Sequence, residues 1–370
     1  LPDNVMTDYY SSKLRHLIFE EGHLVEFLSF ENRLGIFESI HRSYKFAVTT
    51  LVKGDKSPYS SFKAFFYKQN LSSLQNELEK LDYPLELVFA EKDTYSLFEP
   101  RTKEDFLLYQ KIVLSYPSLG KTELIKLTTD FNKTSDSNLF SPITNNQIPL
   151  YEGKFMDQFK VYPSSLKESV EIAEVERKVK SEYRHWRIGL RAQASSTNKR
   201  TLIATLFPPY TTATHSLQIQ SGSGKVNIKD KSFFLGILNS YILDFCLRQL
   251  VTTNITQNFL KQLPIPTAPE FPYYDEITLL SKSLLKKNGK PYDELDKLLK
   301  DEGIANPTEF DELSVETLTA ELNARVALGF KLTREEVINL MKTFESANHK
   351  QAVQEEAQRI IDVYDRLSGE

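Results

Sequence analysis

The 370-residue chain has one cysteine, no long apolar run and no recurring metal-ligand spacing. Cys246 cannot form a disulfide within the chain, which excludes a small disulfide-stabilised secreted scaffold and fits a reducing cytoplasm. The longest apolar stretch, residues 233–247, is too short to span a membrane and is interrupted by Asn239 and Asp244. We therefore expect no membrane segment, and no signal peptide is visible.

Patterns typical of metal and phosphate sites are also missing. The six histidines are not paired at metal-ligand spacing, and one cysteine cannot build a zinc site, so no metal is expected. The run from Gly222 to Lys225 resembles a phosphate-binding loop, but Ile219 and Val226 stand where such a loop needs a glycine and a Ser or Thr. No cofactor-binding residue is therefore expected in this chain.

One proline pair resembles part of a catalytic motif. Enzymes that methylate amino groups of DNA bases use a polar residue, then Pro-Pro, then an aromatic residue that stacks on the flipped base. Here Phe207 precedes Pro208-Pro209-Tyr210 and offers no acceptor for the target amine. We interpret this run as the end of a strand and expect no catalytic residue in the chain.

What is present is an ordinary globular composition, with 40% hydrophobic, 12% aromatic and 26% charged residues. Such a composition excludes long disorder and low-complexity repeats. The length predicts two or three compact units. The first residue is Leu1, and the chain opens in what resembles the middle of a motif, so we expect a piece of a longer polypeptide.

Charge is distributed unevenly behind a net value of -4. Residues 151–269 carry 16 Lys and Arg against 9 Asp and Glu, whereas residues 1–150 have a net charge of -3 and residues 270–370 a net charge of -8. Residues 177–200 hold eight basic residues against the single acidic Glu182. This density indicates a surface for a polyanion such as DNA, or alternatively a solvated helix face balanced by acidic neighbours such as Glu174 and Glu176.

Hydrophobic periodicity predicts a multi-domain α+β chain. Helix is expected at 7–21 and strand at 24–30 and 44–52, and Thr102 is positioned to cap a helix. Further along, we expect a loop at 130–146, a long helix that begins with a capping box of Ser165 and Glu168, a hairpin at 214–228, a buried helix at 233–250, a stiff linker at 267–273 and five acidic helices from 275 to 367.

Several segments, taken in order, resemble one family. They are residues 150–158, 183–191, 195–204, 207–209 and 215–217, followed by 238–240, 254–258, 262–266, 321–327 and 332–336. As a set they resemble the target-recognition region of large bacterial restriction-modification adenine methyltransferases of the Taq type and the type IIG-like group. Residues 1–2, 13–15, 36–37 and 44–46 are similar to the last third of their catalytic domain, and residues 130–140 to the segment that leads into target recognition.

The resemblance implies four regions. They are the C-terminal strands of a methyltransferase catalytic domain at 1–58, a mostly helical connecting region at 59–149, a mixed α/β target-recognition domain at 150–268 and a helical C-terminal region at 269–370. The parent enzyme would methylate adenine N6 in bacterial, cytoplasmic DNA with S-adenosylmethionine, as part of a type II restriction-modification defence system. The cofactor loop, the catalytic motif and any nuclease domain would lie before Leu1, so this fragment by itself would be inactive.

The resemblance implies two partners, double-stranded DNA and the missing N-terminal catalytic domain. Basic residues are candidates for phosphate contact and a polar run between them for base contact, since Asn pairs with adenine and Arg with guanine. The candidates are Lys154, Arg187, Arg191, Ser196, Thr197, Asn198, Lys199, Arg200, His215, Asn254, Gln257 and Asn258. Two other readings stay open: a non-enzymatic scaffold whose acidic tail docks a protein, and a specificity subunit that acts in trans.

Overall fold

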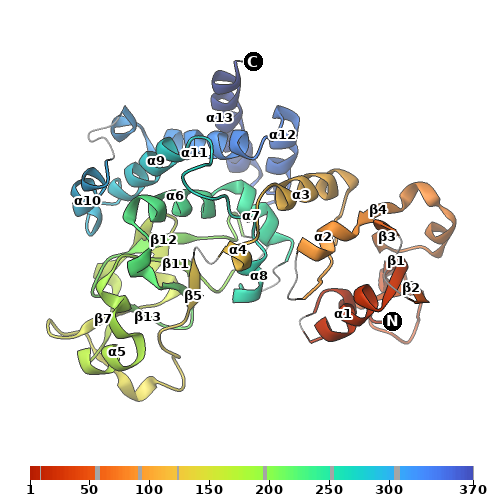
Figure 1. Ribbon diagram of the computed structural model, residues 1–370, viewed down its shortest axis with the longest axis horizontal. Coiled ribbons are helices and arrows are strands. Elements are labelled where there is room, and N and C mark those ends of the chain that lie inside the picture. Colours follow the sequence, from red (N-terminus) through yellow and green to blue (C-terminus); the bar gives the residue numbers. More distant parts are fainter. Residues whose placement is uncertain are drawn as a thin grey trace. The chain divides into compact units, whose positions relative to one another are not determined.

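The computed structural model describes residues 1–8, 10–54, 59–90, 94–122, 125–194, 198–250, 254–303 and 309–369. It is a mixed α+β chain with several small sheets, as the sequence predicts (Figure 1). The chain divides into two compact units, unit 1 (Leu1–Leu114) and unit 2 (Ser115–Glu370). The four predicted regions do not match this division, because strands on both sides of residue 58 belong to one sheet.

Unit 1 is built on a four-stranded sheet with the order β2-β1-β3-β4. β1 pairs antiparallel with β2 and parallel with β3, and α1 packs against β1. Leu28, Phe30 and Phe65 form a core cluster. The elements are α1 (Ser12–Glu20), β1 (Gly22–Glu31), β2 (Lys45–Lys53), β3 (Ser61–Lys68), β4 (Leu81–Pro84), α2 (Leu85–Ala90) and α3 (Lys103–Ser115).

Unit 2 contains two four-stranded sheets and a two-stranded ribbon. The sheets have the orders β12-β11-β14-β5 and β13-β7-β10-β6, and the ribbon pairs β8 with β9. The strands are β5 (Lys126–Thr128), β6 (Phe140–Pro142), β7 (Ile148–Tyr151), β8 (Met156–Asp157), β9 (Lys160–Val161), β10 (Glu168–Val170), β11 (Arg187–Arg191), β12 (Ala204–Phe207), β13 (Thr212–Ala213) and β14 (Leu217–Ser221).

A helical layer covers the β11–β12 sheet. α6 packs against β11 and β12 and also against α9, so it is buried on all sides, and α9 packs in turn on α11. A side chain at Gly236 of α6 would meet Ser281 Oγ at 2.6 Å, so only glycine allows α6 to approach α9 this closely. The helices are α4 (Leu119–Thr122), α5 (Ile172–Val179), α6 (Ile228–Leu238), α7 (Tyr241–Arg248), α8 (Gln257–Lys261), α9 (Tyr274–Lys286), α10 (Leu295–Asp301), α11 (Val315–Gly329), α12 (Arg334–Lys342) and α13 (Lys350–Ser368).

Three local predictions in unit 2 are wrong. The long helix from Ser165 is instead strand β10 followed by the eight-residue α5, since residues 168–170 pair with β6 and β7. The hairpin at 214–228 is strand β14 followed by a short 3-10 helix and the start of α6. The buried helix at 233–250 is two helices, α6 and α7.

The break between α6 and α7 has a clear cause. The side-chain amide of Asn239 accepts a hydrogen bond from Ala204 N–H at 3.0 Å and donates one to Ala204 O at 3.0 Å. The Ser240 hydroxyl then caps α7 by accepting from Leu243 N–H. Helix α6 therefore ends where Asn239 satisfies the backbone N–H and C=O of Ala204 on β12. Helix α7 begins directly afterwards, because Ser240 is a favourable N-cap residue.

Candidate nucleic-acid interface

The buried arginines of unit 2 hold the fold together. Arg187 on β11 is 1% exposed, and its guanidinium bonds both oxygens of Asp130 at 3.0 and 2.9 Å and the carbonyl of Thr211 at 2.8 Å. A fully enclosed, bidentate pair of this kind leaves no donor surface for a phosphate. We therefore remove Arg187 from the candidate DNA contacts that the sequence predicts.

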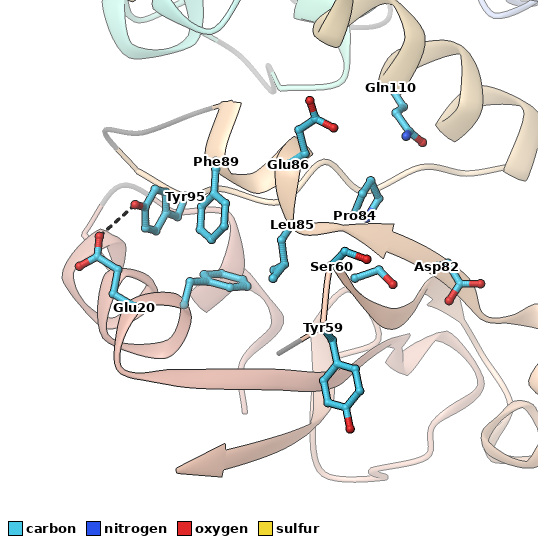
Figure 2. Close-up of a pocket in the computed structure, with 12 residues that line it drawn as sticks. Glu20, Tyr59, Ser60, Asp82, Pro84, Leu85, Glu86, Phe89, Tyr95 and Gln110 are labelled. Atoms are coloured by element: carbon cyan, nitrogen blue, oxygen red, sulfur yellow. Dashed lines mark hydrogen bonds between the residues drawn. The ribbon is translucent and has the colours of Figure 1, made fainter. Parts of the chain in front are cut away.

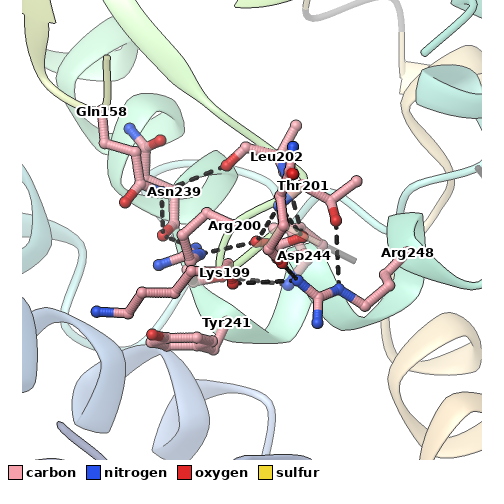
Figure 3. Close-up of polar contacts among 12 residues, drawn as sticks. Gln158, Lys199, Arg200, Thr201, Leu202, Asn239, Tyr241, Asp244 and Arg248 are labelled. Carbon is pink, nitrogen blue, oxygen red and sulfur yellow. Dashed lines mark hydrogen bonds and ion pairs between the residues drawn. The ribbon is translucent and has the colours of Figure 1, made fainter. Parts of the chain in front are cut away.

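Arg200 is likewise enclosed. Its Nε lies 2.7 Å from Asp244 Oδ2, its Nη2 donates to Asn239 O at 2.6 Å, and the guanidinium stacks on the Tyr241 ring at 4.0 Å (Figure 3). Burial, the largest single cause, lowers the pKa of Arg200, but Asp244, Tyr241 and Glu356 together outweigh it, so the pKa is raised and the charge is retained. Arg200 therefore anchors the chain at the end of the polar run instead of pointing toward a ligand.

Asp244 organises this anchor from within α7. Its two oxygens also accept from the backbone N–H groups of Thr201 and Leu202, so one buried carboxylate fixes three consecutive residues. The sequence carried a signal for it, because a charged residue in an otherwise apolar buried helix must have a partner. Without the fold, however, nothing in the sequence showed which basic residue would be that partner.

Two further side chains clamp the same segment. The Arg248 guanidinium donates to the carbonyls of Asn198 and Lys199, the latter at 3.0 Å, and stacks on the Phe344 ring at 4.2 Å. Lys199 Nζ lies 2.9 Å from Glu356 of α13, whose carboxylate also accepts from Tyr241 Oη. The C-terminal helices thus support the base of the polar run.

The other end of the run is fixed against the segment at 254–258. Gln193 forms an antiparallel bridge with Asn254, and Ile255 N–H donates to Ala192 O at 2.7 Å. The second stretch of candidates, which begins at Asn254, is therefore held against residues 192–193 at the end of β11. Asn198 and Asn254 are exposed there, Gln257 and Asn258 are half-buried in the first turn of α8, and Ser196 and Thr197 lie outside the described residues.

Lys154, Arg191 and His215 form a neighbouring group. Arg191 donates to the carbonyls of Gly153 and Met156, and Lys154 is 65% exposed with Glu152 at 3.3 Å. His215 is exposed, and its Nδ1 accepts from Lys133 N–H at 3.0 Å. This group adjoins the first, because Ala192 N–H donates to Ser216 O while its carbonyl accepts from Ile255. We call the whole set, 154, 191, 198–199, 215, 254 and 257–258, the β11-end surface.

The basic residues around α5 are largely neutralised by their neighbours. Arg177 pairs with Glu174 at 2.7 Å and Arg184 with Glu176 at 2.5 Å. Lys178 pairs with Asp136 at 2.5 Å. Most of the basic residues at 177–200 are therefore either buried with a carboxylate, as Arg187 and Arg200 are, or paired with an acidic side chain at the surface. The β11-end surface consequently has fewer exposed basic groups than the sequence indicates.

The main cavity described in unit 1 has a different character. It has a volume of 1050 Å³ and is lined by aromatic side chains, among them Phe19, Phe89 and Tyr95, and by carboxylates such as Glu20 and Glu86 (Figure 2). Tyr95 Oη donates to Glu20 at 2.9 Å, and burial together with this carboxylate raises the pKa of Tyr95. Since none of the described residues that line it is basic, the cavity does not suit a phosphate group.

Within the described ranges, no group of three or more His, Cys, Asp and Glu side chains is arranged to hold a metal ion. No helix of the described chain combines the length and apolarity needed to cross a membrane.

Comparisons with known proteins give a limited result. No protein-family model matches the chain, and no curated protein matches it. Among solved structures, the type IIG restriction endonuclease BpuSI is 11% identical with a TM-score of 0.37 over 99% of this chain. The type IIL restriction-modification enzyme MmeI, solved in complex with DNA, is 10% identical with a TM-score of 0.37 over 100% of this chain. This chain spans 46% and 49% of those two proteins, and at such a TM-score the likeness carries no conclusion about its fold or activity.

Proposed function

We propose that this chain is the DNA-recognition part of a type II restriction-modification enzyme that methylates adenine N6 with S-adenosylmethionine. One observation carries the proposal: residues 192–193, just before the first polar stretch, are joined by backbone pairing to residues 254–255, where the second stretch begins, at the end of β11. Both are fixed by backbone bonds at their bases while Asn198 and Asn254 stay exposed. A rigid base with exposed amides is the arrangement that reading of base edges requires.

Each remaining candidate has a distinct role in this proposal. Lys154 and Lys199 contact phosphates, because their side chains are 65% and 40% exposed and a phosphate can replace the carboxylate that each now faces, Glu152 or Glu356. Asn198, Asn254 and the polar residues 196–197 read bases. Arg200, Asp244 and Arg248 position the run without touching DNA. The catalytic chemistry and the cofactor belong to a partner module, so the chain alone binds DNA weakly and does not methylate it.

Fluorescence anisotropy with a labelled mixed-sequence duplex tests DNA binding. We expect binding at about 50 mM salt that weakens by orders of magnitude toward about 200 mM, because phosphate contacts release counterions. Lys154→Gln and Lys199→Gln should each lower the slope of log affinity against log salt by about 1. Lys300→Gln, on exposed α10, is the matched control and should leave the slope unchanged.

Binding that is absent at low salt, or indifferent to salt, would overturn the proposal and favour a protein-docking scaffold. Heat released on adding S-adenosylmethionine to the chain in a calorimeter would contradict the assignment of the cofactor to another module. Asn198→Ala and Asn254→Ala separate base reading from phosphate contact, because they should change the preference among duplex sequences while leaving the salt slope intact.

A further inference from the structure

The two edges of the unit 1 sheet differ in how they are protected. β4, at one edge, has four residues and includes Asp82 and Pro84, which are features that prevent further strand pairing. β2, at the other edge, has nine residues, and its run from Phe46 to Val52 contains neither a charge nor a proline. Natural proteins rarely leave a long, uncharged apolar edge strand open, because it recruits another strand.

The outer edge of β2 is already paired at one end. Leu1 N donates to Ala47 O at 3.0 Å and Ala47 N–H donates to Leu1 O at 2.8 Å, while Pro2 forms an antiparallel bridge with Phe46. Because Ala47 N–H faces outward, the alternation along a strand directs the N–H groups of Thr49 and Leu51 to the same edge. Leu1 thus sets the direction and register for a strand along the rest of β2.

Exposed apolar side chains accompany this edge on both faces of the sheet. Val48 and Val52 point to one face and Leu51 to the other, and each is more than 40% exposed. On α1, which packs against β1, Leu14 and Leu17 are 43% and 50% exposed and lie on one side of the helix. An occupant must therefore pair with the edge of β2 and also cover apolar surface on the faces of the sheet.

We propose that the outer edge of β2 binds a further extended strand, antiparallel to β2 and collinear with Leu1–Pro2, that carries apolar side chains in alternation. Naming this strand as part of the catalytic module rests on the proposed function, whereas the pairing itself rests only on unit 1. A second copy of the chain fits less well, because Leu1 and Pro2 already occupy the edge at Phe46 and Ala47 and leave only 48–53 for an approaching β2.

The pairing is tested by supplying the strand. The chain is extended before Leu1 by about six residues that alternate Val and Thr, enough to run along 48–53. The control carries an extension of the same length made of Gly and Ser. Hydrogen exchange of the peptide that covers β2 is compared in the two proteins, with β4 as internal reference. We expect exchange at Thr49 and Leu51 to slow by at least about tenfold with the Val/Thr extension only.

A substitution on β2 checks the register. Thr49→Pro removes an outward N–H that is not directed at β1, so unit 1 should stay folded while the added protection at Leu51 is lost. Equal exchange with both extensions would overturn the proposal. So would light scattering that shows a dimer of the unextended chain with its β2 amides already protected. Duplex DNA binding, measured on the same proteins, reports the proposed function separately, because none of these changes touches unit 2.

Discussion

The two units differ in how completely each covers its own apolar surface. Of the 19 large apolar side chains that are exposed in the described parts of the chain, 15 lie in unit 1 and four in unit 2, although unit 2 is more than twice as long. Unit 2 encloses α6 between a sheet and α9, whereas the sheet of unit 1 ends in the open edge of β2. Unit 1 therefore leaves more of its apolar surface exposed to solvent than unit 2 does.

Both units bury charge, but in different ways: the buried Arg15 of unit 1 donates to the carbonyls of Val5 and Thr94, whereas the buried arginines of unit 2 pair with carboxylates. Unit 2 encloses Arg187 with Asp130 and Arg200 with Asp244, each with a side-chain exposure of 10% or less. Such pairs are maintained only where the surrounding core excludes water on every side. The largest expected effects of substitution are therefore in unit 2.

The first prediction removes a buried partner. Asp130→Ala leaves the Arg187 guanidinium enclosed without its carboxylate and also removes the acceptor of Thr212 Oγ1 and Ala213 N–H. We expect a loss of about 3–5 kcal/mol in the free energy of unfolding of unit 2. Hydrogen exchange during denaturant titration, resolved by peptide, should show the midpoint of unit 2 falling and that of unit 1 unchanged.

Glu174→Ala is the matched control, because it breaks an exposed ion pair with Arg177 in the same unit and should cost less than about 1 kcal/mol. Equal losses for the two variants would contradict the structural role of Asp130. A simultaneous loss in unit 1 would contradict the independence of the two units.

The second prediction uses two lysines whose surroundings shift the pKa in opposite directions. In unit 2, Lys231 donates only to the carbonyls of Trp186 and Ser223, and burial lowers its pKa to about 8. In unit 1, burial also opposes the charge of Lys45, but Glu99 and Asp3 outweigh it and raise the pKa of this lysine.

The signs of the pH dependence differ accordingly. For Lys231 the folded pKa lies below the ordinary value of 10.5, so folded unit 2 binds fewer protons between pH 8 and 10.5 and its stability rises with pH in that window. For Lys45 the stabilisation is complete below 10.5 and is lost only as pH rises through the higher folded pKa. The effect is measured as the unfolding midpoint of unit 2 at several pH values. Lys231→Met is the control, because without the amine the rise in stability between pH 8 and 10.5 should disappear. If the Lys231→Met variant shows the same dependence of stability on pH, then another titrating group causes it.

The third and smallest prediction concerns the surface of unit 1. Leu51→Thr replaces an exposed apolar side chain on β2 and should change the stability of unit 1 by less than about 0.5 kcal/mol. Fluorescence of a hydrophobic dye bound to the chain should nevertheless decrease, because the open edge loses apolar area. Thr50→Ser on the same strand is the control and should leave the dye signal unchanged. A stability loss as large as that of Asp130→Ala would show that β2 is part of a closed core.

Local rules in the sequence predicted many elements correctly. Alternating apolar residues located β1 and β2, and Thr102 caps α3 by accepting from Asp105 N–H at 3.0 Å. The capping box expected at Ser165 failed because strand pairing of 168–170 with β6 and β7 satisfies the same backbone groups.

The sequence singles out two polar stretches as DNA contacts, and this stays a prediction. The structure pairs Gln193, just before the first stretch, with Asn254 in the second. The sequence also ranked Arg187 and Arg200 with the exposed lysines, because all of them carry the same charge in the same segment. The residues that hold the site in place, Asp244, Arg248 and Glu356, were not identified, since each lies 42 or more residues from the groups it binds.

The sequence by itself determined what depends on neighbouring residues: strands β1 and β2 of unit 1, the cap of α3 at Thr102, and the single cysteine without metal-ligand spacing. Only the tertiary structure decided which positive charges are available to a ligand. A basic residue becomes a phosphate contact or a core ion pair according to whether a distant carboxylate is folded against it. Asp130 stands 57 residues before Arg187, and Asp244 stands 44 residues after Arg200. Burial is a property of the packed chain, and no local pattern of charge encodes it.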